Sequence, residues 1–493
     1  MNVLLIYPKF PDTFWSFKYA LKFIRKKAAY PPLGLLTVAA MLPPGMNKRL
    51  VDVNVDRIAD ADLEWADMVF IGAMAVQRNS AKEIIERCKA AGLKTVAGGP
   101  LFTAEPEAFQ EVDHLILDEA EQTLPKFLKD LKTGYLKKIY RASEFCDLAY
   151  TPPPDWDLIA MKNYASMSIQ FSRGCPFNCD FCNVTVLFGH KPRLKSVQQI
   201  LSELDHIHAA GWRGNIFFVD DNFIGNKRYL KRHLLPALIR WRKQHRGCTF
   251  ITEASINLAD DAELMGMMVR AGFESVFIGI ETPNEASLTE CKKVQNRNRN
   301  LMEDVKILQR AGLEVQAGFI VGFDNDTAST FEQLIRFIQK SGIVTAMVGL
   351  LQAPPGTRLF ERMQRENRLI SARMSGDNVD GSTNVQPVMG LEQLMKGYRS
   401  IMAHIYSPRH YYRRVKVLLK EFGSPKAEAP MNMQRMLAFV RSSIRLGVFG
   451  KERFHFWYLL TWTLLHKPRL LPMAVTLAIT GHHFRKVCET HIL

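Results

Sequence analysis

The sequence predicts an α/β protein with two successive series of parallel strands and a helical C-terminal region. Over residues 1–135, and again over about 185 residues from residue 166, short apolar runs alternate with helical patterns. Strands that alternate with helices are typical of parallel sheets. The alternation stops near residue 370, and the tail is aromatic and basic. A chain of 493 residues fits two or three domains.

The first series predicts a doubly wound parallel sheet. Its expected strands are residues 3–8, 49–55, 68–74, 94–100 and 114–119. Ligands of such sheets lie beyond the carboxyl ends of the strands, where Gly72, Gly98 and Gly99 would let a flat ligand approach the backbone. Tight turns need glycine at these places as well, so this signal alone leaves both interpretations open.

The second series predicts a partial (β/α)6 barrel of the TIM type over residues 166–370. Residues 136–165, which include three consecutive prolines, are the expected linker before it. The expected strands are residues 166–173, 215–221, 248–255, 275–281, 314–323 and 345–351. Two of the helical patterns between them end in Ala-Gly directly before the next strand, as helix C-caps do. Such barrels place their chemistry on loops at the carboxyl ends of the strands. The remainder, residues 371–493, is expected to be a mainly helical domain.

Positive charge is concentrated at the C-terminus. Residues 401–493 hold 15 Lys and Arg against 4 Asp and Glu, so they carry +11 of the net charge of +16. Such a segment attracts nucleic acid or an anionic membrane surface, or is a solvated face. No signal peptide is evident, which predicts a reducing, cytoplasmic compartment where cysteines bind metals or react. No apolar run reaches about 18 residues, so no segment is expected to cross a bilayer.

The most specific pattern is RGCPFNCDFCN at residues 173–183, with Cys175, Cys179 and Cys182 directly after a predicted strand. Three thiolates on one loop suit three irons of a [4Fe-4S] cubane and leave the fourth iron open to another ligand. A structural zinc site is the alternative, but it commonly uses four ligands in two pairs, and the other five cysteines are isolated. The spacing therefore favours an open cluster.

This loop, with Phe181 before its third cysteine, resembles the radical S-adenosylmethionine (SAM) superfamily over residues 166–370. The resemblance implies that SAM chelates the open iron and yields a 5′-deoxyadenosyl radical that removes hydrogen from a substrate. Asp220 and Asp221 stand where the family has a Gly-Gly-Glu segment that meets the methionine amine, although the glycines are missing. The other SAM contacts that the resemblance implies, near the ribose and the adenine, are Glu253, Ser255, Asn257, Gly279 and Glu281.

A doubly wound domain before such a barrel is the layout of the cobalamin-binding members, and YPPLGLL (30–36) and GGP (98–100) resemble that group. The resemblance identifies residues 1–135 as a Rossmann-like cobalamin-binding domain. The D-x-H-x-x-G motif that supplies a lower ligand is absent, because His114 is the only histidine before residue 150 and lacks both partners. Cobalamin is therefore expected without a histidine ligand from this domain.

Further segments, among them VFIGIETP (276–283) and IYSPRHYYRR (405–414), resemble the branch that includes hopanoid C-2 methylases. This resemblance implies methylation of an unactivated carbon of a lipid or isoprenoid-like substrate. It also implies an electron donor of the reductase, flavodoxin or ferredoxin type.

Several alternatives stay open. One is radical oxidation or ring formation without methyl transfer. Another, less favoured without an RNA-binding motif, is nucleic-acid modification through Tyr411, Tyr412, Arg413 and Arg414. A last alternative concerns the aromatic and basic residues Trp457, Tyr458, Trp462 and Arg469. Their composition fits an interfacial anchor or the core of a small helical domain. An anchor would place the protein peripherally at the inner face of the membrane.

Overall fold

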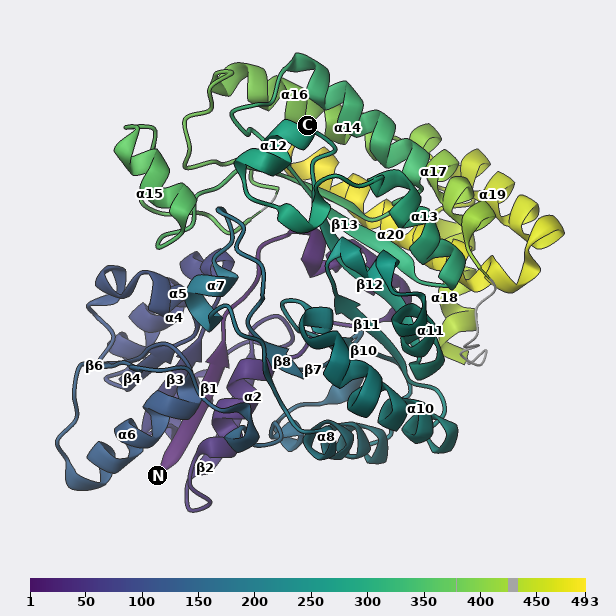
Figure 1. The fold of residues 1–493 in the computed structure, drawn as a ribbon. Coiled ribbons are helices and arrows are strands. Elements are labelled where there is room, and N and C mark those ends of the chain that lie inside the picture. Colours follow the sequence, from purple (N-terminus) through teal and green to yellow (C-terminus); the bar gives the residue numbers. More distant parts are fainter. Residues whose placement is uncertain (378, 424–432) are drawn as a thin grey trace.

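Two six-stranded parallel sheets form the frame of the computed structural model (Figure 1). The structure describes residues 1–377, 379–423 and 433–493. The first sheet has the order β2-β1-β3-β4-β5-β6, with every neighbouring pair parallel. Its strands are β1 (Asn2–Tyr7), β2 (Asn47–Asp52), β3 (Met68–Gly72), β4 (Lys94–Gly98), β5 (His114–Ile116) and β6 (Ile139–Tyr140). The five expected strands are confirmed, and β6 is an additional strand within the segment expected to be a linker.

Both faces of the first sheet are buried by helices. Alternate residues of each strand point to opposite faces and therefore belong to different apolar clusters. On β1, Leu4 and Ile6 belong to the apolar cluster with α3 and α4, whereas Val3 and Leu5 belong to the cluster with α2 and α6. The helices are α2 (Leu33–Met41), α3 (Asp60–Trp65), α4 (Arg78–Ala90) and α6 (Ala120–Thr133). Helices on both faces make this sheet doubly wound, as predicted.

The second sheet holds its six parallel strands in chain order. They are β7 (Met167–Ile169), β10 (Asn215–Phe218), β11 (Thr249–Glu253), β12 (Phe273–Glu281), β13 (Glu314–Val321) and β14 (Ala346–Leu350). The helices that cover it include α8 (Val197–Ala209), α10 (Leu235–Gln244), α11 (Ala262–Ala271), α13 (Leu301–Ala311) and α14 (Ala328–Ser341). This is the partial barrel that the sequence predicts.

Glycine ends two of these helices as expected. Gly272 and Gly312 adopt φ values of +107° and +100°, and each N–H donates to carbonyls of the last helical turn. Because L-residues rarely adopt this left-handed conformation, Ala-Gly stops the helix directly before the next strand.

Residues 14–24, between β1 and α2, pack against the C-terminal helices. Their helix α1 (Lys18–Ile24) lies against α18 (Met433–Arg445) and α20 (Leu471–His491). The ring of Phe14 is 5.1 Å from that of Phe484, and the Phe14 carbonyl is 3.0 Å from Nε2 of His483. The N-terminal segment therefore joins the two ends of the chain.

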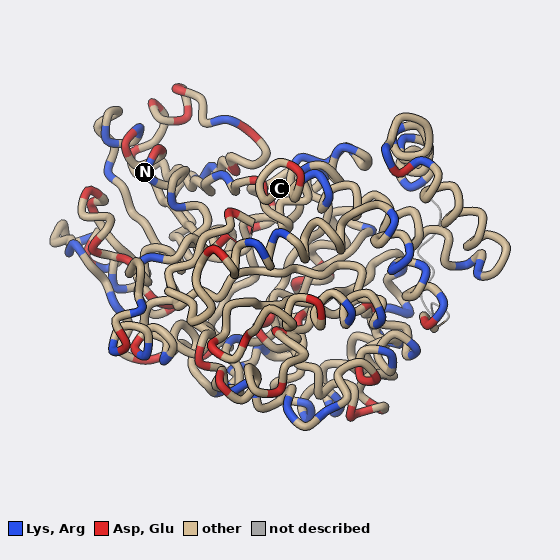
Figure 2. Tube along the Cα trace, turned by 90° about the horizontal axis from the view of Figure 1, so that it is seen from above, with Lys and Arg blue, Asp and Glu red and all other residues tan. Residues whose placement is uncertain are grey.

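The C-terminal region is helical, as predicted. Its other helices are α16 (Leu391–Ile405), α17 (Pro408–Glu421) and α19 (Arg453–His466), and α15 (Arg358–Arg365) precedes them after the last barrel strand. Helices α16 and α17 pack on α14 of the barrel. Basic residues outnumber acidic ones on the C-terminal helices, toward the right of Figure 2.

The structure corrects the nucleic-acid alternative for three of its four residues. Tyr411, Tyr412 and Arg414 are buried between the helices, and Arg414 donates to the carbonyls of Ile405 (2.8 Å) and Val344 (3.2 Å). Arg413 alone of the set is exposed. These tyrosines are therefore not available to stack on bases. Across the described residues, no helix is both long enough and apolar enough to cross a bilayer.

Candidate active site

The three loop cysteines lie at the carboxyl end of the first barrel strand. They follow the short strand β8 (Ser172–Arg173), and helix α7 (Val184–Phe188) begins two residues after Cys182. Cys179 is buried, Cys175 and Cys182 are half-buried, and all three are free thiols. Gly174 has a φ of +92° and lies so close to three carbonyl oxygens that a Cβ would not fit. This glycine permits the tight entry into the loop.

Two acidic residues after β10 hold the start of the loop. Asp220 accepts hydrogen bonds from the Phe171 N–H (3.1 Å) and from the N–H and hydroxyl of Ser172 (2.5 Å each). Asp221 accepts from the N–H of Gly174 at 3.0 Å. Burial raises the pKa of Asp220 to about 7 and that of Asp221 to about 6. Asp220 is fully buried, and its carboxylate holds the start of the loop in place; its contact with the SAM amine stays a prediction.

Side-chain amides approach two of the three sulfurs. Asn222 Nδ2 lies 3.9 Å from Sγ of Cys175, and Gln295 Nε2 lies 3.7 Å from Sγ of Cys179. N–H groups directed at cluster sulfurs stabilise a cluster and tune its reduction potential. Gln295 was missed by sequence reasoning because 116 residues separate it from Cys179 and no motif spacing links the two.

A largely enclosed cation, which sequence reasoning also missed, lies beside the same loop. Lys293 Nζ is 2.6 Å from Oε1 of Glu281 and 5.8 Å from the ring centre of Phe181. Burial acts to lower the pKa of Lys293, but the charges of Glu281 and Cys179 outweigh it and hold that pKa above its usual value. Glu281 has a left-handed φ of +62° at a register shift between β12 and β13, and a Cβ at Gly279 would collide with this pair. Gly279 and Glu281 therefore serve the Lys293 site.

The thiols fit an iron–sulfur cluster. Burial raises the pKa of Cys182 to about 12 and also raises that of Cys175, so both are protonated until a metal displaces the proton. Across the described residues, no three His, Cys, Asp or Glu side chains meet where a single ion would be held. The ligands of a cubane each bind a separate iron and so lie further apart.

The expected ribose contacts follow β11 and join the same network. Asn222 Nδ2 donates to Oγ of Ser255 (3.2 Å), and that hydroxyl donates to Oδ1 of Asn257 (2.6 Å). Glu253 ends β11, and its carboxyl group has no hydrogen bond within the described part of the chain. Burial, with the charges of Asp221 and Asp220, raises the pKa of Glu253 to about 8. The structure thus brings a polar shelf next to Cys175, with one carboxyl group left for a ligand.

The expected glycines of the first domain lie where β3 and β4 end, and each has a reason within the domain. A Cβ at Gly72 would collide with Leu35, and one at Gly98 with the carbonyl of Ile116. Gly99 has a φ of +97°. These glycines permit close packing at the edge of the sheet, and Gly99 directly precedes Pro100, which lines a cavity.

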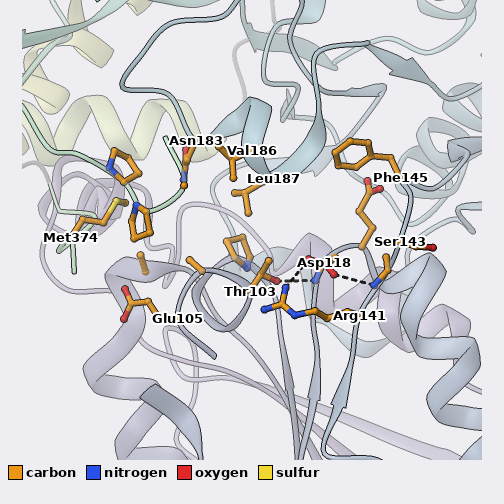
Figure 3. A pocket seen from close by; sticks show the side chains of 18 of the residues that line it. Thr103, Glu105, Asp118, Arg141, Ser143, Phe145, Asn183, Val186, Leu187 and Met374 are labelled. Carbon is orange, nitrogen blue, oxygen red and sulfur yellow. Dashed lines mark hydrogen bonds and ion pairs between the residues drawn. The ribbon is translucent and has the colours of Figure 1, made fainter. Parts of the chain in front are cut away.

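That cavity, of about 500 Å³, separates the first domain from the cysteine loop (Figure 3). Its floor is polar and comes from the carboxyl edge of the first sheet, including Thr103, Asp118 and Arg141. The N–H groups of Asp118 and Ala142 donate within this floor, to Thr103 Oγ1 (2.9 Å) and Asp118 Oδ2 (3.0 Å) respectively. Its roof is largely apolar and is formed by Asn183, Val186 and Leu187 around α7, with Pro354, Pro355 and Met374. Asn183 directly follows Cys182, so a group held here would lie next to the cluster loop.

No histidine lines this cavity among the described residues. His114 begins β5, whereas Asp118, which lies beyond the other end of β5, faces the cavity. The Nδ1 atom of His114 is 2.7 Å from the carbonyl oxygen of Lys137. His114 therefore lies at the end of β5 that is remote from this cavity.

A buried cluster of charges fastens the first domain to the loop. Arg173 donates to Glu119 (3.0 Å) and Glu121 (2.7 Å), and Arg193 donates to Glu119 (2.8 Å). None of these four side chains is more than 15% exposed. We call this set the interdomain clamp. Arg173 is two residues before Cys175, so the clamp sets the distance between the cavity floor and the cysteine loop.

Three family models match consecutive parts of the chain. The B12 binding domain matches residues 25–128, the Radical SAM superfamily matches residues 169–338, and a domain of unknown function (DUF4070) matches residues 357–492. The first covers the part of the cavity floor that holds Thr103 and Asp118, and the second covers the cysteine loop.

Two curated relatives extend over nearly the whole chain. An uncharacterized methyltransferase of Synechocystis sp. is 42% identical over 99% of this chain and 92% of its own. The hopanoid C-2 methylase of Rhodopseudomonas palustris is 33% identical over 92% of this chain and 88% of its own.

Two solved structures share the fold. The cobalamin-dependent SAM radical enzyme OxsB with aqua-cobalamin has a TM-score of 0.64 at 15% identity, over 99% of this chain and 80% of its own. The radical SAM methyltransferase TsrM from Kitasatospora setae, with cobalamin and a [4Fe-4S] cluster bound, has a TM-score of 0.57 at 16% identity, over 74% and 78%.

Proposed function

This chain belongs to the cobalamin-dependent radical SAM methyltransferases, and we propose that it transfers a methyl group to an unactivated carbon of a hydrophobic, lipid or isoprenoid-like substrate. Its cofactors are a [4Fe-4S] cluster, SAM and cobalamin. When bound, SAM on the cluster supplies a hydrogen-abstracting adenosyl radical, and methylcobalamin supplies the methyl group. The observation that carries the proposal is the cavity between the cobalamin domain and the cysteine loop, because a cobalamin held on its floor would lie next to a cluster on that loop.

The residues of the chain would divide the work as follows. Cys175, Cys179 and Cys182 would hold three irons of the cluster. Glu253 would accept hydrogen bonds from the ribose hydroxyls of SAM, with Ser255 and Asn257 beside it. The floor of the cavity would meet the polar edge of cobalamin, while its apolar roof excludes water from the reacting groups.

Aromatic side chains on the inner face of the barrel support a hydrophobic substrate. Phe277 pairs in register with Glu253, so both point to the face turned away from the packed helices. The ring of Trp15 lies 5.3 Å from that of Phe277, and the ring of Tyr30 lies 5.4 Å from that of Phe217. Offset and tilted rings of this kind present flat apolar surface. A fused-ring lipid matches such a surface better than a charged substrate does.

Radical SAM enzymes need an electron donor, and we propose a reductase, flavodoxin or ferredoxin for this one. Lys292 and Arg358 are 52% and 41% exposed, and both pair with Oδ1 of Asp180 in the cysteine loop, at 3.3 and 3.0 Å. Exposed cations near the cluster would attract an acidic electron-transfer protein.

Product mass tests the function. The protein is purified without oxygen, reconstituted with iron, sulfide and hydroxocobalamin, and given a reductant, trideuteromethyl-SAM and polycyclic isoprenoid lipids. We expect cobalt and iron to be retained and a product that carries the labelled methyl group. A product that loses hydrogens instead would establish oxidation or cyclisation, and iron without retained cobalt would overturn methyl transfer from cobalamin.

A further inference from the structure

Large apolar side chains are exposed along α18, α19 and the turn between them. Of the 25 large hydrophobic side chains that are exposed on the described residues, 13 lie between residues 433 and 465. The most exposed of these 13 are Phe449 (81%), Leu465 (79%) and Phe454 (75%). Single exposed hydrophobics are ordinary, whereas a cluster of this size marks an interaction surface.

We propose that this surface, the docking face of residues 433–469, binds an anionic membrane. It stands at the edge of the molecule beside α17 and α20 (Figure 1). The proposal adds a place of action to the proposed function. It depends on that function only in taking the substrate to be a lipid.

The charges of the docking face select the partner. Seven Lys and Arg lie within residues 433–469, and none of them is buried. The single acidic residue, Glu452, is 1% exposed in its side chain and pairs with Arg485 at 2.7 Å. The exposed charge is therefore entirely positive, next to exposed aromatic and aliphatic groups. This combination binds lipid headgroups through cations while the apolar groups enter the interface.

Other partners fit the same surface less well. A second copy of the chain docked face to face would oppose two sets of like charges. Nucleic acid would use the cations but would leave Phe449, Phe454 and Leu465 in water. An anionic bilayer surface satisfies both kinds of side chain.

The docking face also contacts the segment that reaches the inner face of the barrel. Arg441 Nη1 donates to the carbonyl of Phe23 at 2.7 Å, and the Arg445 guanidinium lies 5.5 Å from the centre of the Phe23 ring. Phe23 belongs to α1, which follows Trp15, and Trp15 contacts Phe277 inside the barrel. A lipid bilayer at α18 would thus lie next to the segment that helps line the proposed substrate site.

Vesicle binding tests the proposal. The full-length reconstituted protein is sedimented with vesicles of phosphatidylcholine alone or of phosphatidylcholine with phosphatidylglycerol, at low and high salt. We expect binding to the anionic vesicles that weakens with salt. The variant F449S/F454S/L465S should bind at least tenfold more weakly, because three anchors are lost and no buried contact changes. The variant Y135S/Y150S, which removes equally exposed rings outside the docking face (83% and 82%), should bind like the wild type.

Several results would overturn the docking face. These are no binding to anionic vesicles, unchanged binding by the triple variant, or a dimer in gel filtration that the triple variant abolishes while vesicle binding is absent. Methylation of a detergent-dispersed lipid separates this proposal from the function. Methylation without vesicle binding would refute the docking face alone, and vesicle binding without methylation of any lipid would refute the proposed function alone.

Discussion

Replacing Arg173 by methionine should loosen the cobalamin domain from the barrel. Methionine keeps the apolar stem but removes the charge that faces Glu119 and Glu121. Arg193 still pairs with Glu119 at 2.8 Å, so one carboxylate, that of Glu121, stays buried without a cation. Breaking a buried ion pair costs about 3–5 kcal/mol. We expect about 3 kcal/mol, because Thr151 still donates to Glu121 at 2.9 Å.

This loss corresponds to a roughly 100-fold shift in the equilibrium between docked and released domains. Urea unfolding of the apo-protein, followed by tryptophan fluorescence, measures the stability, and cobalt retained per chain after desalting measures the cofactor site. R173M should lose both stability and cobalt. The double variant R173M/E121Q should regain stability, because the unpaired carboxylate is gone. K94M, which breaks an exposed pair with Asp113 in the same domain, should change stability by less than about 1 kcal/mol.

The pH dependence of the effect follows from Glu121. Burial acts to raise the pKa of Glu121, and Arg173 outweighs it and holds that pKa below its usual value. The pair of Arg173 and Glu121 therefore stabilises the fold fully at pH values above the pKa of Glu121 in the unfolded chain, about 4.3. This stabilisation is lost as the pH falls through the lower pKa that Glu121 has in the folded protein. Without Arg173, burial raises the pKa of Glu121, so the deficit of R173M should be largest near neutral pH and should shrink toward pH 4. An R173M protein within about 1 kcal/mol of the wild type at neutral pH, or a deficit that grows on acidification, would refute the clamp.

Four further predictions concern the site itself. Cys179→Ala should abolish both the bound iron and turnover, whereas Cys291→Ala should keep iron near the wild-type content; an active Cys179→Ala enzyme would contradict the assignment of the cluster. Lys293→Met should lower the midpoint potential of the cluster by on the order of 50 mV in an EPR redox titration, because a cation beside the thiolates is lost and Glu281 is left unpaired. The controls Lys293→Arg and Lys292→Met should keep the potential of the wild type. An unchanged potential in Lys293→Met would show that the ammonium group does not act on the cluster. The affinity for SAM, measured by calorimetry, should strengthen between pH 7 and 9, because Glu253, with a pKa of about 8, ionises and then accepts hydrogen bonds from the ribose. Glu253→Gln should remove this pH dependence. A pH dependence that persists in Glu253→Gln would point to another group. Enzyme reconstituted with iron and sulfide but without cobalamin should still cleave SAM under reducing conditions and form no methylated product, so methylation without added cobalamin would refute the role of the first domain.

Much of the fold could be predicted because local sequence patterns mark the strands and the ends of the helices. The apolar run at residues 68–74 became β3, and the Ala-Gly pairs at Gly272 and Gly312 ended their helices. The short strand β6 was not expected, because two residues between polar neighbours carry no periodic signal. The outcome for Tyr411 and Arg414 also depended on packing, since a basic aromatic helix has the same composition whether it is exposed or buried.

The sequence by itself determined the chemistry of the cluster. The positions of Cys175, Cys179 and Cys182 are close along the chain, so covalent spacing alone brings their thiols onto one loop. Only the tertiary structure decided what surrounds that loop. It enclosed Asp220 as a support, brought Lys293 and Gln295 to the sulfurs, and built the cavity between two domains. Such contacts join residues that are far apart in the chain, and they form only when both sheets have packed. Tertiary packing also decides which side chains are exposed. The cations and rings of residues 433–469 therefore form a docking face only in the folded protein.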